Sequence, residues 1–233
     1  MEEKKWGLSG GTLKIIALVS MIIDHATAVF VNYYDYEVLY NMGRCIGRLA
    51  FPLYCFLLVE GFCYTRNVKK YCVRLFLFAI ISEVPFDLAF FRRVIYMGHQ
   101  NVFFTLLLGI LLIWNMDRIL KKKNSNWIGN VLNVIGAIVV YVLSSYIYSD
   151  YGVYGVLLIA LFYLFRGNKG KVAASNIGFN FIFSVGSIRQ LAGVCSVPII
   201  ALYNGKKGVS LKYFFYLIYP LHLLLFYWIK VYC

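Results

Sequence analysis

The sequence predicts an all-α fold: a polytopic bundle of transmembrane helices. Of the 233 residues, 61% are hydrophobic and only 14% are charged, whereas a soluble domain carries about 25% charged residues because its surface faces water. The hydrophobic residues form runs separated by short basic clusters. Such runs suit helices that cross a bilayer, each of about 20 residues. No polar linker divides the chain, so we expect a single transmembrane domain over residues 1–233.

Nine membrane spans are expected. Six are clear, at about 12–31, 44–64, 71–91, 102–119, 127–148 and 212–231. Three shorter spans are expected in the less regular remainder, at about 152–165, 172–187 and 191–203. Small residues such as Gly178 and Gly193 weaken the signal there, although they also permit close helix packing. Eight spans are the alternative.

The net charge of +13 does not indicate nucleic-acid binding, because the basic residues lie in clusters between apolar runs. In the nine-span arrangement most of the 23 Lys and Arg residues fall on one side. Cytoplasmic loops are enriched in such residues, which predicts a cytoplasmic N-terminus in the cell membrane and an outer C-terminus. The residues on the predicted cytoplasmic side are Lys4, Lys5, Lys14, Arg66, Lys69, Lys70, Arg74, Arg118, Lys121, Lys122, Lys123, Arg166, Lys169, Lys171, Lys206, Lys207 and Lys212.

Ionisable residues inside the predicted spans are the candidates for function, because a charge in a bilayer costs a few kcal/mol at least. Arg44 and Arg48 open the second span, and Glu83 and Asp87 close the third. Each pair has i, i+4 spacing and so shares a helix face. Their opposite signs and similar depth predict a salt-bridged polar core near the outer surface. Arg48 and Glu83 are also open to a purely helix-orienting role.

His25 is the candidate general base. A histidine titrates near neutral pH, and one beside Asp24 in an otherwise apolar helix suits proton removal from an attacking amine or hydroxyl. Asp24 points about 100° away from His25 on a helix. Two arrangements therefore stay open: Asp24 orients His25, or Asp24 contacts a neighbouring helix and Glu83 or Asp87 orients His25.

No metal site is predicted. His25, His99 and His222 belong to different spans, so no two of them share a helix at ligand spacing. The six cysteines are scattered through apolar runs without metal-ligand spacing. His222, midway along the last span, is open to a ligand-binding role or to a hydrogen-bonded core position.

Nine short segments across nearly the whole chain carry a resemblance to a known family: Leu13 to Ala17, Ile23 to His25, Gly43 and Arg44, Ile46 to Pro52, Leu57 to Phe62, Tyr64 to Arg66, Ile81 to Asp87, Asn101 to Leu106 and Tyr219 to Leu223. Together they resemble the TraX family, membrane proteins named for the acetylation of conjugative pilin, most strongly in the first half. The resemblance implies an acetyltransferase whose acceptor is the N-terminal amine of a pilin or another secreted peptide, with a surface-glycan hydroxyl as the alternative.

The family is similar in turn to the wider acyltransferase-3 group, in which a basic residue precedes a histidine by eleven positions in the first helix. Lys14 and His25 have that spacing, which places them on one face about 16 Å apart. The resemblance implies that cytosolic acetyl-CoA meets Lys14 and that an acceptor arrives from outside.

The implied site divides into three sets of residues. The expected catalytic residues are His25, Asp24, Glu83 and Asp87. The residues expected to bind the phosphates of the donor are Lys14, Arg66, Lys69 and Lys70. The residues expected to bind the acceptor or the oxyanion are Arg44, Arg48, Asn101 and His222. Two other functions stay open. Buried His and carboxylate groups also form proton relays in transporters, and the chain could be a non-enzymatic assembly or immunity factor.

Overall fold

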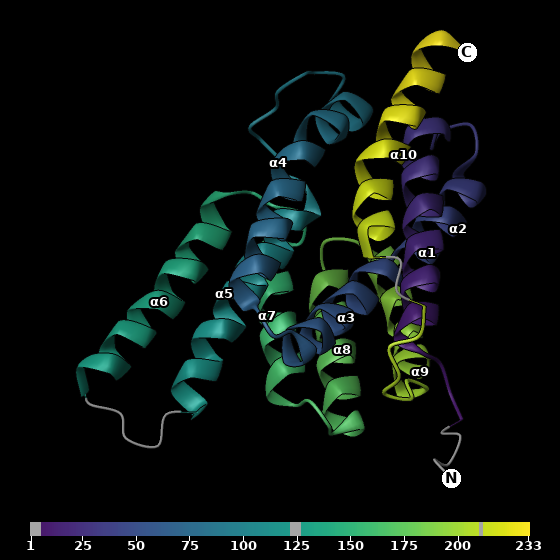
Figure 1. The fold of residues 1–233 in the computed structure, drawn as a ribbon. Coiled ribbons are helices and arrows are strands. Elements are labelled where there is room, and N and C mark those ends of the chain that lie inside the picture. The colour runs from purple at the N-terminus through teal and green to yellow at the C-terminus, as the bar shows by residue number, and fades with distance from the viewer. Residues whose placement is uncertain (1–5, 122–126, 210–211) are drawn as a thin grey trace.

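The computed structural model describes residues 6–121, 127–209 and 212–233, and every regular element in them is a helix (Figure 1). Lys4, Lys5, Lys122 and Lys123 lie outside the described residues. The elements are α1 (Gly10–Phe30), α2 (Glu37–Gly47), α3 (Ala50–Tyr64), α4 (Val68–Phe91), α5 (Val102–Lys121), α6 (Trp127–Tyr146), α7 (Gly152–Leu164), α8 (Lys169–Ser184), the 3-10 helix η1 (Ile188–Cys195), α9 (Ser196–Ala201) and α10 (Lys212–Tyr232).

Capping side chains start three of these helices. Ser9, Asn67 and Asn168 each accept a hydrogen bond from a backbone N–H in the first turn of α1, α4 and α8. Such caps satisfy one of the first N–H groups, which have no partner inside the helix. Each helix therefore begins within a few residues of the predicted span.

Among the described residues, five segments are long and apolar enough to cross a membrane: Gly10–Phe30, Glu37–Tyr64, Val102–Lys121, Trp127–Tyr146 and Tyr213–Tyr232. The chain is accordingly a helical protein with several apolar helices, as expected of a multi-pass membrane protein. The 24-residue α4 is equally long, but Arg74, Glu83 and Asp87 interrupt its apolar sequence. The helices α7, α8 and η1 with α9 are shorter.

The predicted span over 44–64 lies within the candidate membrane segment Glu37–Tyr64, but it is not one unbroken helix, because Arg48 and Leu49 form a turn between α2 and α3. The cause is Pro52, which has no N–H to donate to the carbonyl of Arg48 and whose ring clashes with a carbonyl four residues earlier. The predicted span at 191–203 is also not one α-helix, since η1 gives way to α9 at Ser196.

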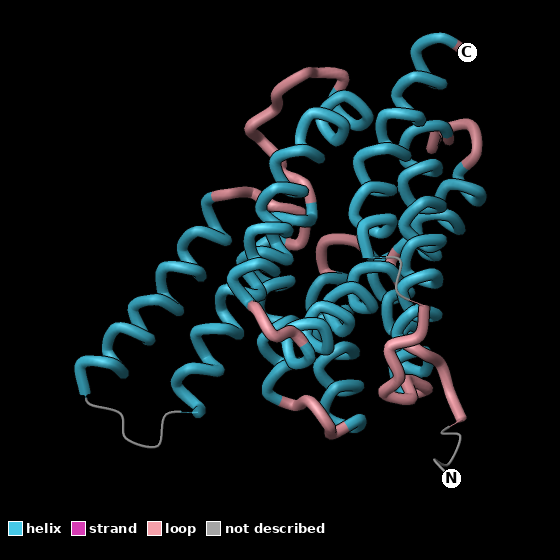
Figure 2. The backbone as a smooth tube through the Cα atoms, in the orientation of Figure 1, coloured by secondary structure: helices cyan, strands magenta, loops and turns pink. Residues whose placement is uncertain are grey.

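Loops gather at the two ends of the bundle (Figure 2). At the end that holds the N-terminus, Leu8 N–H donates to Leu202 O at 2.8 Å, and the end of α3 pairs with the end of α7 through Glu60 and Arg166. At the opposite end, Gln100 N–H donates to Tyr148 O at 3.1 Å. Successive long helices therefore run in opposite directions.

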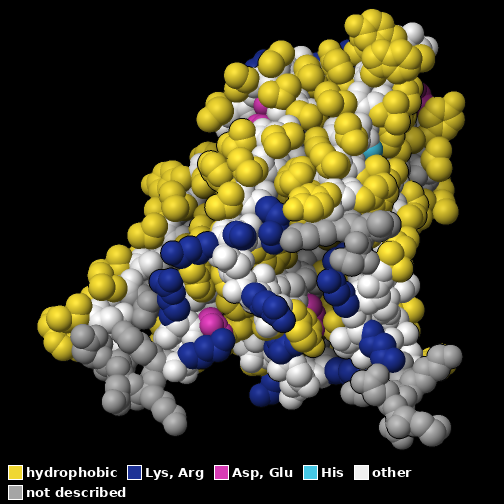
Figure 3. All heavy atoms as spheres, viewed as in Figure 1, with side chains coloured by type: hydrophobic (Ala, Val, Ile, Leu, Met, Phe, Trp, Pro, Cys, Tyr) yellow, Lys and Arg dark blue, Asp and Glu magenta, His cyan; other side chains and the backbone are white. Residues whose placement is uncertain are grey.

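Charge and apolar surface are separated along the bundle. Lys and Arg side chains gather over the lower part of the molecule, towards the N-terminus, and hydrophobic side chains cover the upper part (Figure 3). Many large apolar side chains are exposed, including Leu132 and Ile138 of α6, whereas Leu13, Leu53 and Ile159 are fully buried. An apolar exterior around a packed core is the arrangement that a lipid environment requires.

Two glycines let α1 and α2 approach each other closely. A Cβ atom at Gly43 would lie 2.0 Å from Thr27 Oγ1, and one at Gly47 would lie 2.1 Å from Asp24 Oδ1. The two glycines are four residues apart on one face of α2, the small-residue spacing by which membrane helices pack closely. They bring α2 against the half of α1 that carries Asp24 and His25.

We expect Gly47→Val to push α2 away from α1. The clash with Asp24 should lower stability by about 1–3 kcal/mol, the usual cost of overpacking. A thermal unfolding series on the protein in detergent measures this as a lower Tm. Gly178→Val is the matched control, because a Cβ at Gly178 has no neighbour within 4 Å. Equal Tm values for the two variants would contradict the close approach.

Candidate functional site

A cluster of three charged side chains lies where α1 meets the break between α2 and α3. Arg44 Nη1 donates to Asp24 Oδ2 at 2.8 Å, and Arg48 Nη2 lies 3.9 Å from Asp24 Oδ1. Arg48 Nη1 also donates to the Tyr151 hydroxyl at 3.2 Å. The side chains of Asp24, Arg44 and Arg48 are each less than one-fifth exposed. We name these three residues the outer charge cluster, after their place in the half of the bundle away from the N-terminus.

The predicted pairing of Arg44 and Arg48 with Glu83 and Asp87 is wrong, since both arginines face Asp24 instead. Glu83 accepts a short hydrogen bond from Asn101 Nδ2, and Asp87 accepts one from the Tyr96 N–H at 2.6 Å. These carboxylates thus hold the turn between α4 and α5. Spacing and sign showed which charges lie at similar depth, but not which helices are neighbours.

His25 forms a hydrogen bond with His222 of α10. His25 Nδ1 lies 2.7 Å from His222 Nε2, and the two rings are inclined by only 7°. The ring centroids are 5.0 Å apart, the separation of two rings joined in plane through one hydrogen bond. The partner of His25 among the described residues is therefore a second histidine, not one of the carboxylates expected from the sequence.

A backbone carbonyl determines which nitrogens carry protons. His222 Nδ1 lies 2.7 Å from Ile218 O, and a carbonyl oxygen only accepts, so His222 Nδ1 carries a proton. In the neutral pair His222 Nε2 is then an acceptor, and His25 Nδ1 must donate to it. His25 Nε2 is left with its lone pair, which is the state of a proton acceptor.

Aromatic rings enclose the histidine pair. Phe90 and Tyr219 meet the His25 ring edge-on at centroid distances of 5.3 and 5.8 Å, and Phe226 meets His222 at 5.4 Å. His222 is buried and His25 is half-buried. Asp24 and His25 are consecutive, so the histidine pair and the outer charge cluster lie at the same level of α1.

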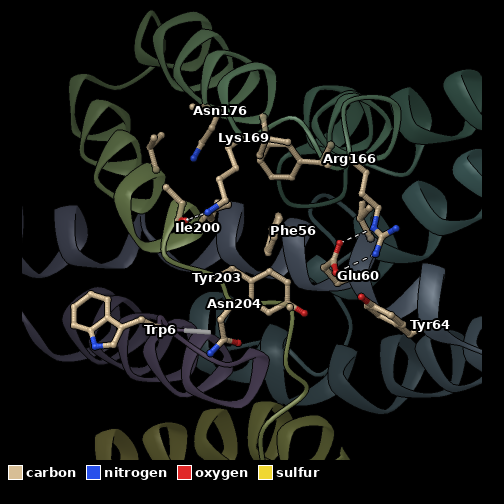
Figure 4. Close-up of a pocket in the computed structure, with 18 residues that line it drawn as sticks. Trp6, Phe56, Glu60, Tyr64, Arg166, Lys169, Asn176, Ile200, Tyr203 and Asn204 are labelled. Carbon is tan, nitrogen blue, oxygen red and sulfur yellow. Dashed lines mark hydrogen bonds and ion pairs between the residues drawn. The ribbon is translucent and has the colours of Figure 1, made fainter. Parts of the chain in front are cut away.

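A pocket opens at the opposite end of the bundle, the end that holds the N-terminus. Its volume is about 580 Å³. In Figure 4 the side chains of Glu60 and Arg166 face each other on one side of the pocket, with Trp6 on the other and Tyr203 between them. Lys169 and Asn176, both from α8, also line it. Charged, amide and aromatic groups are therefore all available there to a ligand.

Glu60 of α3 pairs with Arg166, which follows α7. Arg166 Nε donates to Glu60 Oε1 at 2.7 Å and Nη2 to Oε2 at 3.4 Å. The hydrogen bond with Glu60 raises the pKa of the Arg166 guanidinium above its usual value. Lys169 Nζ donates to Ala201 O at 2.7 Å. Two cations from the turn between α7 and α8 thus line the pocket.

The cations predicted to hold the donor lie elsewhere on the same end. Lys14 Nζ lies 5.7 Å from the centroid of the Phe215 ring, and Arg66, Lys69 and Lys70 are exposed around the start of α4. The lining of the 580 Å³ pocket includes none of these four residues. Sequence reasoning assigned Arg166 and Lys169 to topology alone, and the signal available for them was their position directly after an apolar run.

The site thus combines a proton acceptor, His25 Nε2, with fixed positive charge on Arg44 and Arg48, inside a bundle that also has a polar pocket at its far end. That combination suits acyl transfer, in which a base removes a proton and cations stabilise a developing oxyanion. Among residues 6–121, 127–209 and 212–233 no three His, Cys, Asp or Glu side chains are grouped so as to hold a metal ion.

Comparisons with known proteins agree with the resemblance noted in the sequence. The TraX protein family model matches residues 9–230. The probable fimbrial assembly protein FimC, serogroup H1, of Dichelobacter nodosus is 32% identical over 243 aligned residues, which cover 91% of this chain and 92% of that protein. No solved structure matches the chain. Because the family match runs from the start of α1 to the end of α10, the chain is a member of the TraX family.

Proposed function

We propose that the protein is a membrane-bound acetyltransferase that moves an acetyl group from acetyl-CoA to an acceptor on the outer side of the membrane. The observation that carries the proposal is the hydrogen-bonded series from Ile218 O through His222 to His25. This series leaves His25 Nε2 as an unprotonated acceptor in a largely apolar site. Family membership supports the same reaction.

The reaction is an aminolysis of the thioester. The acceptor amine attacks the acetyl carbonyl carbon, and the new C–N bond forms as the C–S bond breaks. His25 Nε2 takes the proton that the amine loses, and returns it to the departing thiolate. The donor is thereby released as a free thiol, and His25 regains its starting state. Both proton transfers require His25 Nδ1 to keep its proton, which it donates to His222 Nε2; that nitrogen is an acceptor because the Ile218 carbonyl holds the His222 proton on Nδ1.

The outer charge cluster supports the transition state in this scheme. Negative charge develops on the carbonyl oxygen as the amine attacks, and fixed cations in a dry site stabilise such charge strongly. Arg44 and Arg48 are held by Asp24, so they need not reorganise during the reaction. Arg44 Nε is buried and makes no hydrogen bond within the described residues, which leaves a donor for the acceptor or the oxyanion.

The proposed acceptor is the N-terminal amine of a pilin or another secreted peptide. The relative from Dichelobacter nodosus is named for fimbrial assembly, and fimbriae are built from secreted subunits. A peptide of that kind presents its amine on the outer side of the membrane. Asp24 lies in the second half of α1, away from the end of the bundle that holds the N-terminus, and so towards the side from which such a peptide would arrive.

We further propose nine membrane crossings with the N-terminus in the cytoplasm. The alternation of loops between the two ends supports nine if α2 and α3 count as one crossing and η1 with α9 as another. The concentration of Lys and Arg at the end that holds the N-terminus supports the orientation (Figure 3), because basic loops are retained in the cytoplasm.

His25→Ala should lower acetyl transfer by about 10²–10⁴-fold, the usual contribution of a general base, while expression and Tm stay unchanged. Mass spectrometry of secreted pilins and peptides from cells carrying either form measures the effect, as loss of one acetyl mass from an N-terminus. His99→Ala is the matched control, because His99 is partly exposed beside Asp150. Full acetylation in the His25 variant would reject the mechanism.

His222→Phe should slow transfer by about threefold to tenfold relative to His222→Gln, the net value of one hydrogen bond. Glutamine keeps an oxygen that accepts the Nδ1 proton of His25, whereas phenylalanine keeps the ring but has no acceptor. The two variants are compared by kcat and KM on purified protein. Because a role in binding would change KM alone, equal kcat values for both variants would contradict the positioning of His25 by His222.

Single-cysteine variants should report the orientation. With the other cysteines replaced, native Cys233 should react with a membrane-impermeant maleimide on intact cells, because it is exposed at the end of α10. Lys207→Cys should react only after the cells are permeabilised. Eight crossings would reverse this pattern, because the loss of one span between 152 and 203 inverts everything after it: Lys207→Cys would then react on intact cells, and Cys233 only after permeabilisation.

A further inference from the structure

Polar side chains continue inward from the pocket at the cytoplasmic end. Asn176, in the wall of the pocket, is fully buried, and its Nδ2 donates to Ser196 Oγ at 2.7 Å. One turn further along α8, Asn180 Nδ2 donates to Asn176 Oδ1 at 2.7 Å. Asn180 Oδ1 in turn accepts from Gln190 Nε2 at 2.8 Å. We name Asn176, Asn180 and Gln190 the amide file.

The amide file ends against the outer charge cluster. A Cβ at Gly193 would lie 2.1 Å from Asn180 Oδ1 and 3.2 Å from the Arg48 carbonyl oxygen, so Gly193 allows η1 to touch both. Arg48 then contacts Tyr151 and Asp24. Polar groups therefore connect the cytoplasmic pocket with the outer cluster through the interior of an otherwise apolar bundle.

We propose that this pocket binds the nucleotide end of a coenzyme A thioester, and that the amide file is the path of its pantetheine arm towards the outer charge cluster. This inference rests on the proposed function and adds to it a location for the donor. Lys169 and Arg166 take the phosphates in place of Lys14, Arg66, Lys69 and Lys70, the cations expected from the sequence.

The chemistry of each part of the donor matches the part of the protein that it meets. The pantetheine arm is narrow and uncharged and carries two amide groups, which pair with Asn and Gln side chains as both donors and acceptors. The adenosine end is aromatic and carries phosphates. Trp6 and Tyr203 supply aromatic rings that can stack on the adenine. Arg166 Nε and Nη2 bind Glu60, which leaves Arg166 Nη1 to donate to a phosphate.

The burial of the amide file is unusual for groups that only pack helices together. Buried amides cost free energy unless every polar atom is satisfied, and apolar residues would pack α8 against η1 without that requirement. Asn176, Asn180 and Gln190 are 0%, 0% and 2% exposed. They satisfy one another in series, so the two amides of the arm enter by displacing these hydrogen bonds and replacing them with their own. Asn180 lies about 16 Å along α8 from Lys169, about half the thickness of the hydrocarbon core.

Equilibrium binding to purified protein in lipid nanodiscs tests the proposal. The two probes are coenzyme A and adenosine 3′,5′-bisphosphate, which has the nucleotide end and no arm. Lys169→Ala should weaken both by about tenfold, the value of a charge-assisted hydrogen bond. Asn176→Leu should weaken coenzyme A by about tenfold and leave the bisphosphate unchanged. Unchanged bisphosphate binding also shows that the Asn176 variant is folded.

Lys171→Ala is the matched control, because Lys171 is an exposed cation of the same helix outside the pocket lining. Both probes should bind this variant as they bind the unaltered protein. A second measurement uses Ala173→Cys, since Ala173 lines the pocket. Both probes should protect this cysteine from a maleimide, and neither should protect Lys171→Cys.

The outcomes separate this inference from the proposed function. If the unaltered protein transfers acetyl groups, yet Lys169→Ala and Asn176→Leu bind both probes normally, the donor lies elsewhere and only this inference fails. If the unaltered protein binds neither probe and transfers nothing, the acetyltransferase proposal fails as well. A third outcome is that Asn176→Leu weakens the binding of both probes, while both probes still protect Ala173→Cys in the otherwise unaltered protein. That result would overturn the path of the arm and leave the pocket as the binding site.

Discussion

The pairing of Asp24 with Arg44 and Arg48 is the interaction on which the arrangement of the outer half depends. An ionised carboxylate that loses its partner inside a low-dielectric bundle destabilises the fold by several kcal/mol, so α1 and α2 are held together. Gly47 permits the approach. Pro52 breaks the helix after α2, and the break lets Arg48 reach Asp24 while Arg44 reaches it from the last turn of α2.

The same pairing determines where His25 points. Consecutive residues on a helix diverge by about 100°, so a helix whose Asp24 is fixed against α2 presents His25 to a different neighbour. That neighbour is α10, where His222 accepts the hydrogen bond. The rotation of α1 about its axis, and hence the chemistry proposed for His25, follows from an ion pair that makes no contact with the His25 ring.

The sequence predicted most helix positions, because apolar length is a local property. Contact of Asp24 with a neighbouring helix was one of the two arrangements that it left open. It did not predict the partners, since depth in a membrane can be read from spacing while the angular position of each helix cannot. The pair Arg44 and Arg48 was therefore matched with Glu83 and Asp87 rather than with Asp24. The amide file was not predicted, because isolated Asn and Gln residues look like ordinary interruptions of an apolar run.

The two polar sites also bear on how a donor and an acceptor on opposite sides of a membrane can react. A carrier would have to open each end of the bundle in turn. Here an ion pair closes each half: Glu60 and Arg166 join α3 to the turn after α7, and Asp24 and Arg44 join α1 to α2. A rigid bundle needs no such alternation if the donor itself spans the distance. The arm of a coenzyme A thioester is long, flexible and neutral, so only that arm and its acetyl group enter the apolar interior. The charged nucleotide and the secreted peptide then each stay on their own side of the membrane.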